Sequence, residues 1–519
     1  MSDDIWTLID RSLERTPEHP AWIRRLPGRR REELSYGAIR EYALRLAYAL
    51  RSRGVSCGDI VGVIAPNGPE WGVAALSVWR LGGIVAPIHI GNSEQDIAAQ
   101  TAALSPKLVL VHNTEHRFSQ SMAVALSELN GTTLSTHDAD FSEAPNREAV
   151  RIYTSGSTGK PKMVRLSHRN ITSNFHAASK LAHIDTTDRF LSLLPLSHAM
   201  ELTGGLLMPL YCGSSIVLPR VLAASEIIES MAEERVSIII AVPRLYRNIM
   251  LGLEKRFRDG SGLLSAYRRV LRRSPVAVRR WINWPIRRRF GGRIKTWVSG
   301  GSRLDPEIGR YFQELGLPLR QGYGLTETSP LVSLQKDFDS ALDSVGKPVE
   351  GVEVKVHEPD ANGSGELCVR GPNVMLGYVD ETQTREVMHG EWFKTGDIGT
   401  IDASGNIRLT GRSKRLIVTE AGKNVYPEEL ETLLERFENV KEAAVLERDM
   451  RPVAVLAMEG SDPEAEARRV IKSFNAKASS HNQVARLAVV DELPRTPLGK
   501  IALSRLEEVF VKNEDKRGG

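Results

Sequence analysis

The sequence predicts a layered α/β fold, in which a large N-terminal domain carries a β-rich subdomain and a small α+β domain follows. Three observations support this fold class. The chain has 519 residues, about three times the usual length of one domain. Helical and strand patterns alternate through its first half, which is typical of a mostly parallel sheet. After residue 346 the chain has short β-prone segments that are separated by glycines, and its C-terminal part has a mixed pattern of helices and strands.

The α/β alternation begins near residue 35. Amphipathic spacing predicts helices, and short apolar runs predict buried strands. In the first stretch we expect helices at 36–53 and 71–81 and strands at 60–64 and 84–87. In the second we expect strands at 190–194, 215–218 and 237–242, and helices that begin at residues 202 and 224. Both stretches therefore indicate parallel strands connected by helices.

The pattern changes after residue 346. Short β-prone segments between glycines predict an antiparallel β subdomain over about 346–411, with strands at 352–356, 365–370 and 406–410. The last part predicts helices at 427–436 and 462–479 and strands near 443–446, 453–458 and 487–490. We place the domain boundary between residues 412 and 413, which gives domains 1–412 and 413–519.

Positive charge is concentrated in one segment. The chain has a net charge of +5, yet residues 254–295 hold 14 Lys or Arg against two acidic residues, so the remainder sums to −7. No recognised nucleic-acid-binding module accompanies the arginines, so we expect no nucleic-acid partner. Basic residues beside Leu and Trp suit an anionic membrane surface. The hypothesis is peripheral membrane contact through residues 255–295, and the alternative is a solvated helix packed on the main domain.

Cysteine content and targeting signals bear on location. Cys57, Cys212 and Cys368 are too widely spaced for a metal site, and their odd number argues against a disulfide framework. The N-terminus lacks the pattern of a signal peptide, and no apolar run approaches the ~20 residues of a membrane span. We expect a cytoplasmic protein, with peripheral contact at the inner membrane surface if the basic segment binds lipid.

The densest local motif is Tyr153-Thr-Ser-Gly-Ser-Thr-Gly-Lys-Pro-Lys162. Its glycines let the backbone approach an anion, its hydroxyls can donate to phosphate oxygens, and its lysine supplies charge. The candidate phosphate-binding residues are Thr154, Ser155, Gly156, Ser157, Thr158, Gly159 and Lys160. A solvated turn is the alternative. A P-loop NTPase is excluded, because two residues rather than four separate the glycines and Pro161 replaces the magnesium-binding hydroxyl.

This segment resembles the phosphate-binding loop of the adenylate-forming superfamily, which includes acyl-CoA synthetases, luciferases and the adenylation domains of peptide synthetases. Four further motifs match in the family's order: Gln321-Gly-Tyr-Gly-Leu-Thr-Glu-Thr-Ser329, Thr395-Gly-Asp397, Gly411-Arg-Ser-Lys414 and Pro494-Arg-Thr-Pro-Leu-Gly-Lys500. The resemblance covers about residues 20–506. It implies ATP-dependent activation of a carboxylic acid to an acyl-adenylate, with release of pyrophosphate.

The resemblance also assigns the nucleotide site. It implies that Glu327 binds Mg²⁺, that Thr326 bonds the α-phosphate, and that Asp397 and Arg412 bond the ribose of ATP. The segments that line the adenine comprise Gly300, Gly301, Ser302, Gln321, Gly322, Tyr323 and Gly324. A carboxylate at Glu327 fits the preference of Mg²⁺ for one or two protein oxygens beside a triphosphate. Taken alone, an Asp or Glu would be an ordinary surface charge.

Three positions of the C-terminal part have implied roles. Lys500 matches the catalytic lysine that bridges carboxylate and phosphate oxygens during adenylation. Lys414 matches the hinge about which a mobile C-terminal domain turns between the two half-reactions. Gly422 matches a glycine that admits the pantetheine arm of the co-substrate CoA.

The acyl pocket is less well defined. His198, in Leu194-Pro-Leu-Ser-His198, resembles the residue at the carboxylate end of that pocket, although it could be a structural histidine. Small residues fall where the family builds its acyl tunnel: Gly204, Gly205, Ala241 and Gly300. Glu201 and Arg244 are charged residues nearby that could equally face solvent. We therefore expect an apolar substrate, most simply a medium- or long-chain fatty acid.

The motifs do not decide to which branch of the superfamily the chain is most similar, nor which thiol accepts the acyl group. Residues 416–431 are similar to long-chain fatty acyl-CoA synthetases, whereas Met163 and Arg415 depart from the family pattern. An acyl-carrier-protein ligase and a CoA ligase for an aryl or branched acid are alternatives within the family. A catalytically silent, membrane-associated binding protein is the alternative from another class, and the intact Glu327, Asp397 and Lys500 argue against it.

Overall fold

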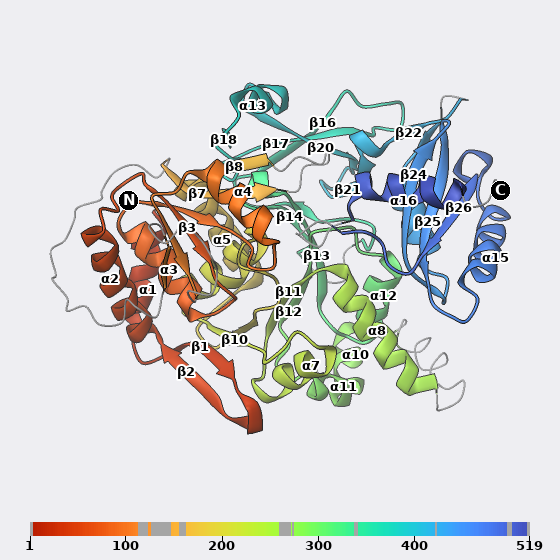
Figure 1. Ribbon diagram of the computed structural model, residues 1–519. Coiled ribbons are helices and arrows are strands. Elements are labelled where there is room, and N and C mark those ends of the chain that lie inside the picture. Colours follow the sequence, from red (N-terminus) through yellow and green to blue (C-terminus); the bar gives the residue numbers. More distant parts are fainter. Residues whose placement is uncertain are drawn as a thin grey trace. The chain divides into compact units, whose positions relative to one another are not determined.

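The computed structural model describes residues 4–112, 123–125, 147–154, 162–258, 271, 274–336, 341–420, 423–495 and 501–515. It confirms the α/β fold class (Figure 1). The chain forms two compact units. The first comprises Met1–Tyr153, Met163–Glu353 and Val369–Phe393, and the second comprises Thr154–Lys162, Val354–Cys368 and Lys394–Gly519. The boundary at residues 412 and 413 stays a prediction.

The first unit contains a mostly parallel seven-stranded sheet, in the order β18-β8-β7-β4-β3-β5-β6. Strand β3 pairs in parallel with β4 and β5, whereas β18 runs antiparallel to β8. The strands are β3 (Ile60–Ile64), β4 (Ile84–Pro87), β5 (Leu108–Val111), β6 (Ala123–Ala125), β7 (Glu148–Thr154), β8 (Lys162–Ser167) and β18 (Gly377–Tyr378). Strands β3 and β4 have the predicted bounds.

A second sheet of nine strands has the order β15-β14-β13-β12-β11-β9-β10-β1-β2. Its strands are β1 (Pro20–Arg25), β2 (Arg31–Ser35), β9 (Arg189–Leu191), β10 (Ser215–Leu218), β11 (Ile238–Ala241), β12 (Thr296–Ser299), β13 (Leu319–Gly324), β14 (Leu331–Leu334) and β15 (Lys347–Pro348). Along the run β10-β9-β11-β12-β13, each strand pairs in parallel with the next. Their carboxyl ends therefore lie along one edge of the sheet.

Helices connect the strands of the first unit. Ser35 and Ser93 begin two of them by accepting a hydrogen bond from a backbone N–H in the first turn. The α-helices are α1 (Ile5–Arg15), α2 (Tyr36–Ser52), α3 (Pro69–Arg80), α4 (Glu94–Leu104), α5 (His168–Ala182), α6 (Met208–Cys212), α7 (Ala224–Glu233), α8 (Pro243–Arg258), α10 (Val276–Ile282), α11 (Trp284–Arg289), α12 (Pro306–Glu314) and α13 (Glu381–Val387). Short elements are η1 (Pro27–Arg29), η4 (Thr326–Thr328) and β19 (Met388–His389).

One predicted helix differs in type. The helix expected from residue 202 begins as a π-helical stretch, η3 (Glu201–Leu207), and becomes α-helical in α6. Gly205 lies directly against the Glu201 side chain, because a Cβ at position 205 would be 2.5 Å from Glu201 Cδ. The wider turn and the missing side chain together make room for a buried carboxyl group. Such π-helical turns occur frequently at functional sites.

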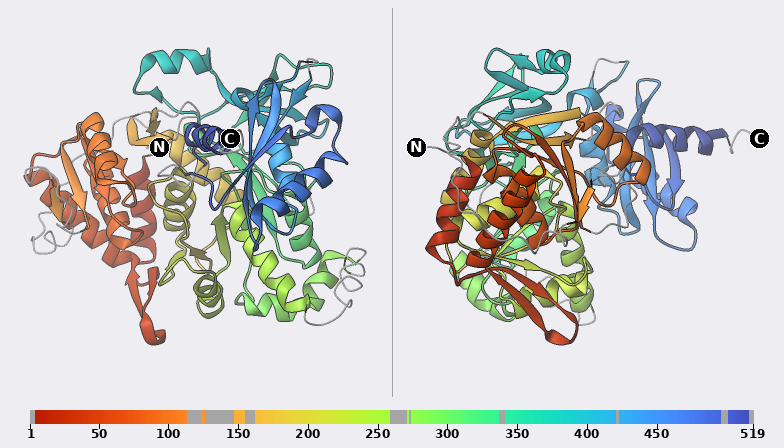
Figure 2. Two further views of the ribbon diagram at one scale, coloured as in Figure 1. Left: turned by 45° about the vertical axis from the view of Figure 1, so that its right-hand side comes forward. Right: turned by 60° about the vertical axis from the view of Figure 1, so that its left-hand side comes forward.

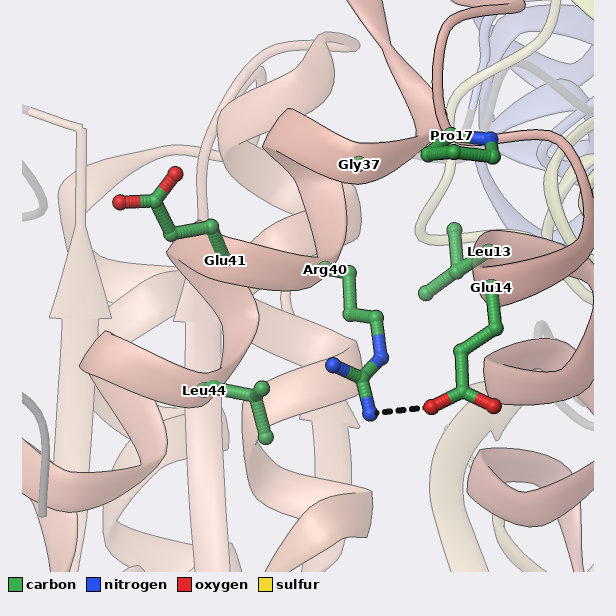
Figure 3. Close-up of a pocket in the computed structure, with 7 residues that line it drawn as sticks. All are labelled: Leu13, Glu14, Pro17, Gly37, Arg40, Glu41 and Leu44. Carbon is green, nitrogen blue, oxygen red and sulfur yellow. Dashed lines mark ion pairs between the residues drawn. The ribbon is translucent and has the colours of Figure 1, made fainter. Parts of the chain in front are cut away.

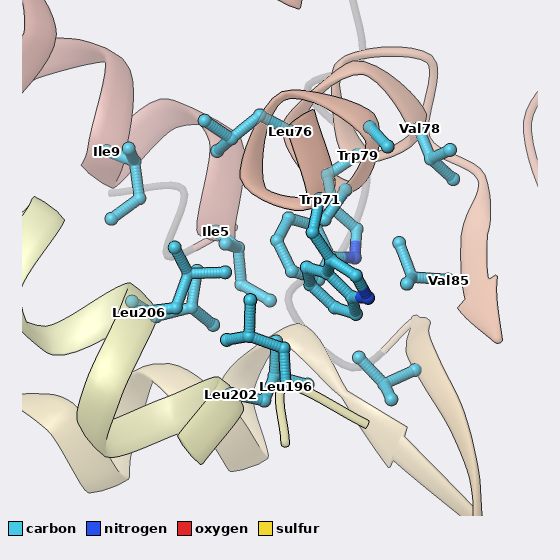
Figure 4. Packing of buried hydrophobic residues seen from close by; sticks show 14 of the residues in the cluster. Ile5, Ile9, Trp71, Leu76, Val78, Trp79, Val85, Leu196, Leu202 and Leu206 are labelled. Carbon is cyan, nitrogen blue, oxygen red and sulfur yellow. The ribbon is translucent and has the colours of Figure 1, made fainter. Parts of the chain in front are cut away.

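A large apolar core supports this region. Ile5 and Ile9 of α1 pack with Trp71 of α3 and with residues just before and within η3, including Leu196 and Leu206 (Figure 4). Helices α1, α2 and α3 also pack against one another, as the views in Figure 2 show. The segment that carries His198 is therefore anchored on both sides by buried leucines.

The second unit contains most of a five-stranded sheet, β16-β17-β20-β19 with β21 paired to β20, and a separate three-stranded sheet, β24-β25-β26. Its strands are β16 (Glu353–His357), β17 (Gly365–Arg370), β20 (Trp392–Ile401), β21 (Ile407–Arg412), β22 (Ile417–Val418), β23 (Asn424–Val425), β24 (Val440–Arg448), β25 (Arg451–Met458) and β26 (Arg486–Val490). Its helical segments are η5 (Ser413–Arg415), α14 (Pro427–Leu434), α15 (Pro463–Asn475), η6 (Ser480–Asn482) and α16 (Leu503–Asp515). Antiparallel pairing of β20 with β21 agrees with the predicted β subdomain.

Candidate active site

The residues predicted to line the adenine lie at the carboxyl edge of the nine-stranded sheet. The register of the parallel strands places Ala241, Ser299 and Gln321 in one row across β11, β12 and β13. Gly300 follows directly, and its N–H donates to the Ala241 carbonyl at 3.1 Å. Nucleotides bind at this edge of open α/β sheets. The structure thus brings together three segments that the sequence keeps far apart.

Strand β13 holds the predicted adenine residues of the second segment, Gln321 to Gly324. Gln321 is buried, and its backbone N–H donates to Gln335 Oε1 at 2.8 Å. Tyr323 is also buried, and Gly324 passes so close to the next strand that a Cβ there would be 1.7 Å from the Pro330 oxygen. Glycine is therefore required at position 324 for steric reasons. Gly301, Ser302 and Gly322 belong to the same two segments.

Thr326 and Glu327 form the short helical turn η4, immediately after β13. Asn174 of α5 fixes this turn: its Oδ1 accepts from the Leu331 N–H at 2.6 Å and its Nδ2 donates to the Thr328 carbonyl at 3.2 Å. The Tyr378 hydroxyl donates to Glu327 Oε1 at 2.8 Å. Burial, together with the neighbouring Glu327 carboxylate, raises the pKa of Tyr378. Sequence reasoning found Glu327 but not Tyr378.

His198 lies at the end of a tightly held loop. Asn67 binds this loop from outside: its Nδ2 donates to Ser192 Oγ at 2.9 Å and its Oδ1 accepts from the Leu196 N–H at 2.9 Å. The ring of His89 is 6.1 Å from that of His198, and burial lowers the pKa of His89. His198 therefore belongs to a loop that is held in place by hydrogen bonds with Asn67.

The buried carboxyl group of Glu201 contacts the same loop. Its Oε1 accepts from Ser192 Oγ at 2.7 Å, and its Oε2 lies 3.4 Å from the Leu194 nitrogen. The residue is 1% exposed, so the expectation that it could face solvent is wrong. Burial raises the pKa of Glu201 to about 7. Local sequence gave no signal of this burial, which depends on the packing of η3.

The predicted acyl-pocket glycines have close neighbours. A Cβ at Gly204 would be 2.8 Å from Ile240 Cδ1, and one at Gly300 would be 2.9 Å from Met200 Sδ. These side chains, with Glu201 beside Gly205, occupy the space that the missing side chains leave. The acyl pocket stays a prediction.

A pocket of about 320 Å³ lies elsewhere in the first unit, between α1 and α2 (Figure 3). Arg40 and Glu14 form an ion pair across it, with Arg40 Nη2 2.7 Å from Glu14 Oε1. Its lining contains none of the predicted site residues. We assign it no part in the chemistry.

The second unit holds the predicted ribose-binding residues. Asp397 of β20 pairs with Arg412 of β21, and Arg412 Nε is 3.0 Å from Asp397 Oδ1. The Asp397 N–H donates to Thr395 Oγ1 at 3.1 Å, and that hydroxyl donates to the Leu367 carbonyl at 2.8 Å. Asp397 is thus fixed by its backbone as well as by its ion pair.

The predicted hinge, Lys414, lies in the turn η5 just after this pair. The next residue, Arg415, is held firmly: Nη2 is 2.5 Å from Glu431 Oε1 and Nη1 is 3.0 Å from Glu428 Oε1. Burial lowers the pKa of Arg415, but the two carboxylates outweigh it and the net shift is upward. Lys414 therefore lies between Arg412 and Arg415, and each of these arginines has a carboxylate partner within the second unit.

Several predicted residues lie outside the described part of the chain: Ser155, Gly156, Ser157, Thr158, Gly159, Lys160, Gly422 and Lys500. Thr154 is described and ends β7. The first unit holds His198, Gly204, Gly205, Ala241, the two adenine segments, Thr326 and Glu327, and the second holds Thr154, Asp397, Arg412 and Lys414.

The residues fit a nucleotide carrying Mg²⁺. The Glu327 carboxylate offers the hard oxygen donors that Mg²⁺ prefers, and a cation bound by triphosphate needs only one or two carboxylates from the protein. Within the described ranges, no group of three His, Cys, Asp or Glu side chains could form a metal cage.

The basic segment is described only in part, because residues 259–270, 272 and 273 lie outside the described chain. Trp281 of α10 is 80% exposed and Trp284 of α11 is 56% exposed. The Arg288 guanidinium lies over the Trp284 ring, 5.1 Å from its centroid. Across the described residues, none of the helices has the length and hydropathy needed to span a bilayer.

One arginine of this segment is structural. Arg287 is buried and donates to the carbonyls of Gly316 and Ile294 at 3.0 and 3.2 Å, although the hypothesis of membrane contact takes the arginines of this segment as exposed. Arg279 is half-buried and donates to the Ser274 carbonyl at 2.8 Å. The exposed basic surface is consequently smaller than the sequence suggests. We call Trp281, Trp284, Arg288 and Arg289 the α10–α11 surface.

Comparisons with known proteins agree with this geometry. A family model described as AMP-binding enzyme matches residues 9–379. The long-chain-fatty-acid–CoA ligase heimdall of Drosophila melanogaster is 29% identical over 491 residues, covering 82% of this chain and 71% of the relative. The feruloyl-CoA synthase of an Amycolatopsis species is 27% identical over 499 residues, covering 92% and 94%.

The fold also matches a solved structure. The O-succinylbenzoate coenzyme A synthetase of Bacillus subtilis, in complex with ATP and magnesium ion, superposes with a TM-score of 0.79 at 24% identity. The match covers 96% of this chain and 99% of that protein. The architecture described above is therefore one found in an enzyme that binds ATP and magnesium.

Proposed function

Because the chain belongs to the AMP-binding enzyme family, we propose that it is an AMP-forming acyl-CoA synthetase. It joins a carboxylic acid to the α-phosphate of ATP, releases pyrophosphate, and transfers the acyl group from AMP to the thiol of CoA. The observation that carries this proposal is the position of Gln321, Tyr323 and Glu327, which follow one another at the carboxyl edge of parallel strands. The CoA-forming relatives support the same reaction.

The chemistry explains why these side chains are needed. A carboxylate is a poor acyl donor, because oxide would have to leave. The mixed anhydride with AMP replaces oxide by a good leaving group, but two anions must first meet, so positioned cations and donors dominate catalysis. Mg²⁺ supplies charge neutralisation on the triphosphate when bound, and Glu327 would hold it. Thr326 would donate to the α-phosphate.

The other predicted residues bind and orient. Asp397 would accept hydrogen bonds from the ribose hydroxyls, and Arg412, already beside it, would donate to the same sugar. Lys160 and Lys500 would hold phosphate and carboxylate oxygens, and the flexible stem of lysine suits a group that must reach and withdraw. Lys414 would be the pivot of that withdrawal, and Gly422 would admit the pantetheine arm.

A fatty acid of medium or long chain is the proposed substrate. The long-chain fatty acid ligase among the relatives supports it. The feruloyl-CoA synthase favours the second candidate, an aryl acid. His198 would face the carboxylate end of the acid in either case. CoA is the proposed acceptor, with an acyl-carrier protein as its alternative.

The test is a pyrophosphate-release assay with the purified full chain. Fatty acids of eight to eighteen carbons, branched acids, aryl acids and amino acids would each be supplied with ATP and Mg²⁺, with CoA or a carrier protein as acceptor. We expect pyrophosphate release and acyl-CoA formation with a fatty acid. Release with aryl acids alone would favour the second candidate. No release with any acid would support the catalytically silent alternative.

We further propose that the α10–α11 surface contacts an anionic membrane, from which the enzyme would draw its apolar substrate. Exposed tryptophans beside arginines suit the headgroup region, where each cation contributes ~1 kcal/mol. This contact would be peripheral.

A further inference from the structure

Tyr378 contacts the candidate magnesium ligand from a strand far away in the sequence. Its hydroxyl donates to Glu327 Oε1 at 2.8 Å, and the tyrosine is 4% exposed. The tyrosine is therefore buried while its partner Glu327 is only half-buried, and a hydrogen bond to a charged acceptor is stronger than one between neutral groups.

The backbone around Tyr378 holds the ring in place. Strand β18 pairs antiparallel with β8, with Tyr378 opposite Val164. The Tyr378 N–H also donates to Thr384 Oγ1 at 2.8 Å, which ties the strand to α13. A ring fixed in this way carries a hydroxyl with little freedom to leave its partner.

The same segment binds Glu327 a second time. The Met375 N–H donates to the Glu327 carbonyl at 2.9 Å. Residues 375–378 thus hold both the backbone and the side chain of Glu327. A surface tyrosine that met a carboxylate by chance would not show this double attachment.

We propose that Tyr378 is a positioning residue that fixes the Glu327 carboxylate for Mg²⁺-dependent binding of ATP. The phenol holds Oε1, which restricts rotation of the carboxylate and would leave Oε2 available to the cation. This inference rests on the proposed function, because it takes Glu327 as the magnesium ligand. Partners that hydrogen-bond a metal ligand typically change metal affinity about 10- to 100-fold when they are removed.

The test compares Tyr378→Phe with the wild type in the full chain. Binding of a fluorescent ATP analogue would be titrated with MgCl₂, and repeated in EDTA. We expect the Mg²⁺ concentration for half-maximal binding to rise about 10-fold or more, whereas binding in EDTA should change less than about 2-fold because the phenol does not touch the nucleotide. The variant lacks a single hydroxyl, so the fold should persist, and a thermal melt would verify this.

Tyr36→Phe is the matched control. Tyr36 is equally buried in the first unit, and its hydroxyl donates to the Ser214 carbonyl at 2.7 Å, away from Glu327. Any loss from Tyr36→Phe should appear as lower thermal stability without a change in Mg²⁺ dependence. A Tyr378→Phe protein that behaves in the same way would overturn the inference.

A double-mutant cycle with Glu327→Gln sharpens the result. If Tyr378 acts through the carboxylate, Tyr378→Phe should have no further effect on Mg²⁺ dependence in the Glu327→Gln background. An equal effect in both backgrounds would contradict the inference. A wild-type protein that binds the ATP analogue without regard to Mg²⁺ would overturn the assignment of Glu327 as the magnesium ligand, and the role of Tyr378 with it, whereas the pyrophosphate-release assay tests the proposed function separately.

Discussion

Asp397 and Arg412 lie opposite each other on adjacent antiparallel strands, with Arg412 Nε 3.0 Å from Asp397 Oδ1. The carboxylate is 8% exposed, whereas the guanidinium is 45% exposed. Because the Arg412 guanidinium is nearly half-exposed, solvent screens the pair and reduces its contribution to stability. Under the proposed function, this adjacent acceptor and donor would serve the ribose of ATP.

Asp397→Asn should therefore weaken ATP binding far more than it weakens the fold. Loss of hydrogen bonds to a charged acceptor lowers affinity roughly 10- to 100-fold. Calorimetric titration with MgATP and urea unfolding would measure the two effects. Asp402→Asn is the control, because Asp402 pairs with Arg408 at 3.0 Å on the same hairpin. Equal affinity losses in both variants would contradict a ribose-binding role.

Glu201 should make stability depend on pH. Its pKa is raised by burial from 4.5 to about 7, so the folded chain binds a proton that the unfolded chain releases. That contribution is complete below pH 4.5 and is lost as the pH rises through 7. Between about pH 5 and pH 8 the loss amounts to about 2 to 3 kcal/mol.

Glu201→Gln removes this titration. Urea unfolding of both proteins at pH 5, 6, 7 and 8 would be compared. We expect the wild type to lose stability relative to the variant as pH rises. Parallel curves for the two proteins would show that Glu201 does not titrate in this range.

Lys500→Ala should separate the two half-reactions. If Lys500 bridges carboxylate and phosphate oxygens, adenylation should slow about 100-fold or more, while thioester formation from a supplied acyl-adenylate should persist. Pyrophosphate release and acyl-CoA formation measure the two steps. Lys512→Ala, an exposed lysine of α16, is the control. Equal loss of both half-reactions would exclude the assignment.

The α10–α11 surface should bind anionic vesicles. Trp281→Ala with Arg288→Glu and Arg289→Glu should reduce co-sedimentation with phosphatidylglycerol vesicles about 10-fold or more, since each cation contributes ~1 kcal/mol. Vesicles of phosphatidylcholine should bind weakly throughout. Arg385→Glu, an exposed arginine of the first unit paired with Glu381, is the control. Unchanged sedimentation of the triple variant would contradict membrane contact.

Local patterns predicted the regular elements well. The strands at 60–64, 84–87, 215–218 and 365–370 have the bounds read from the sequence, because short apolar runs between turns are local signals. The π-helical form of η3 was not predicted, since it depends on how Glu201 packs against Gly205.

The residues of the candidate site that belong to motifs were predicted from the sequence, whereas the residues that support them were not. Motifs predict nucleotide-binding roles for Glu327, Asp397 and Arg412, and these roles stay predictions. Tyr378 and Asn67 were missed, since each reaches its partner through long-range contacts: Tyr378 lies 51 residues from Glu327 and Asn67 lies 125 residues from Ser192. Gly377 and Tyr378 can be read in the sequence, but nothing in their sequence distance from Glu327 predicts that the Tyr378 side chain contacts it.

The sequence by itself determined the fold class, the family and the candidate residues for a nucleotide, because periodicity and motif spacing are properties of neighbouring residues. Tertiary structure alone decided which side chains support them. It buried Glu201, removed Arg287 from the exposed basic surface and placed Tyr378 against Glu327. These outcomes depend on strand register and packing between distant segments, where the free energy of a polar group is set by the partners that surround it.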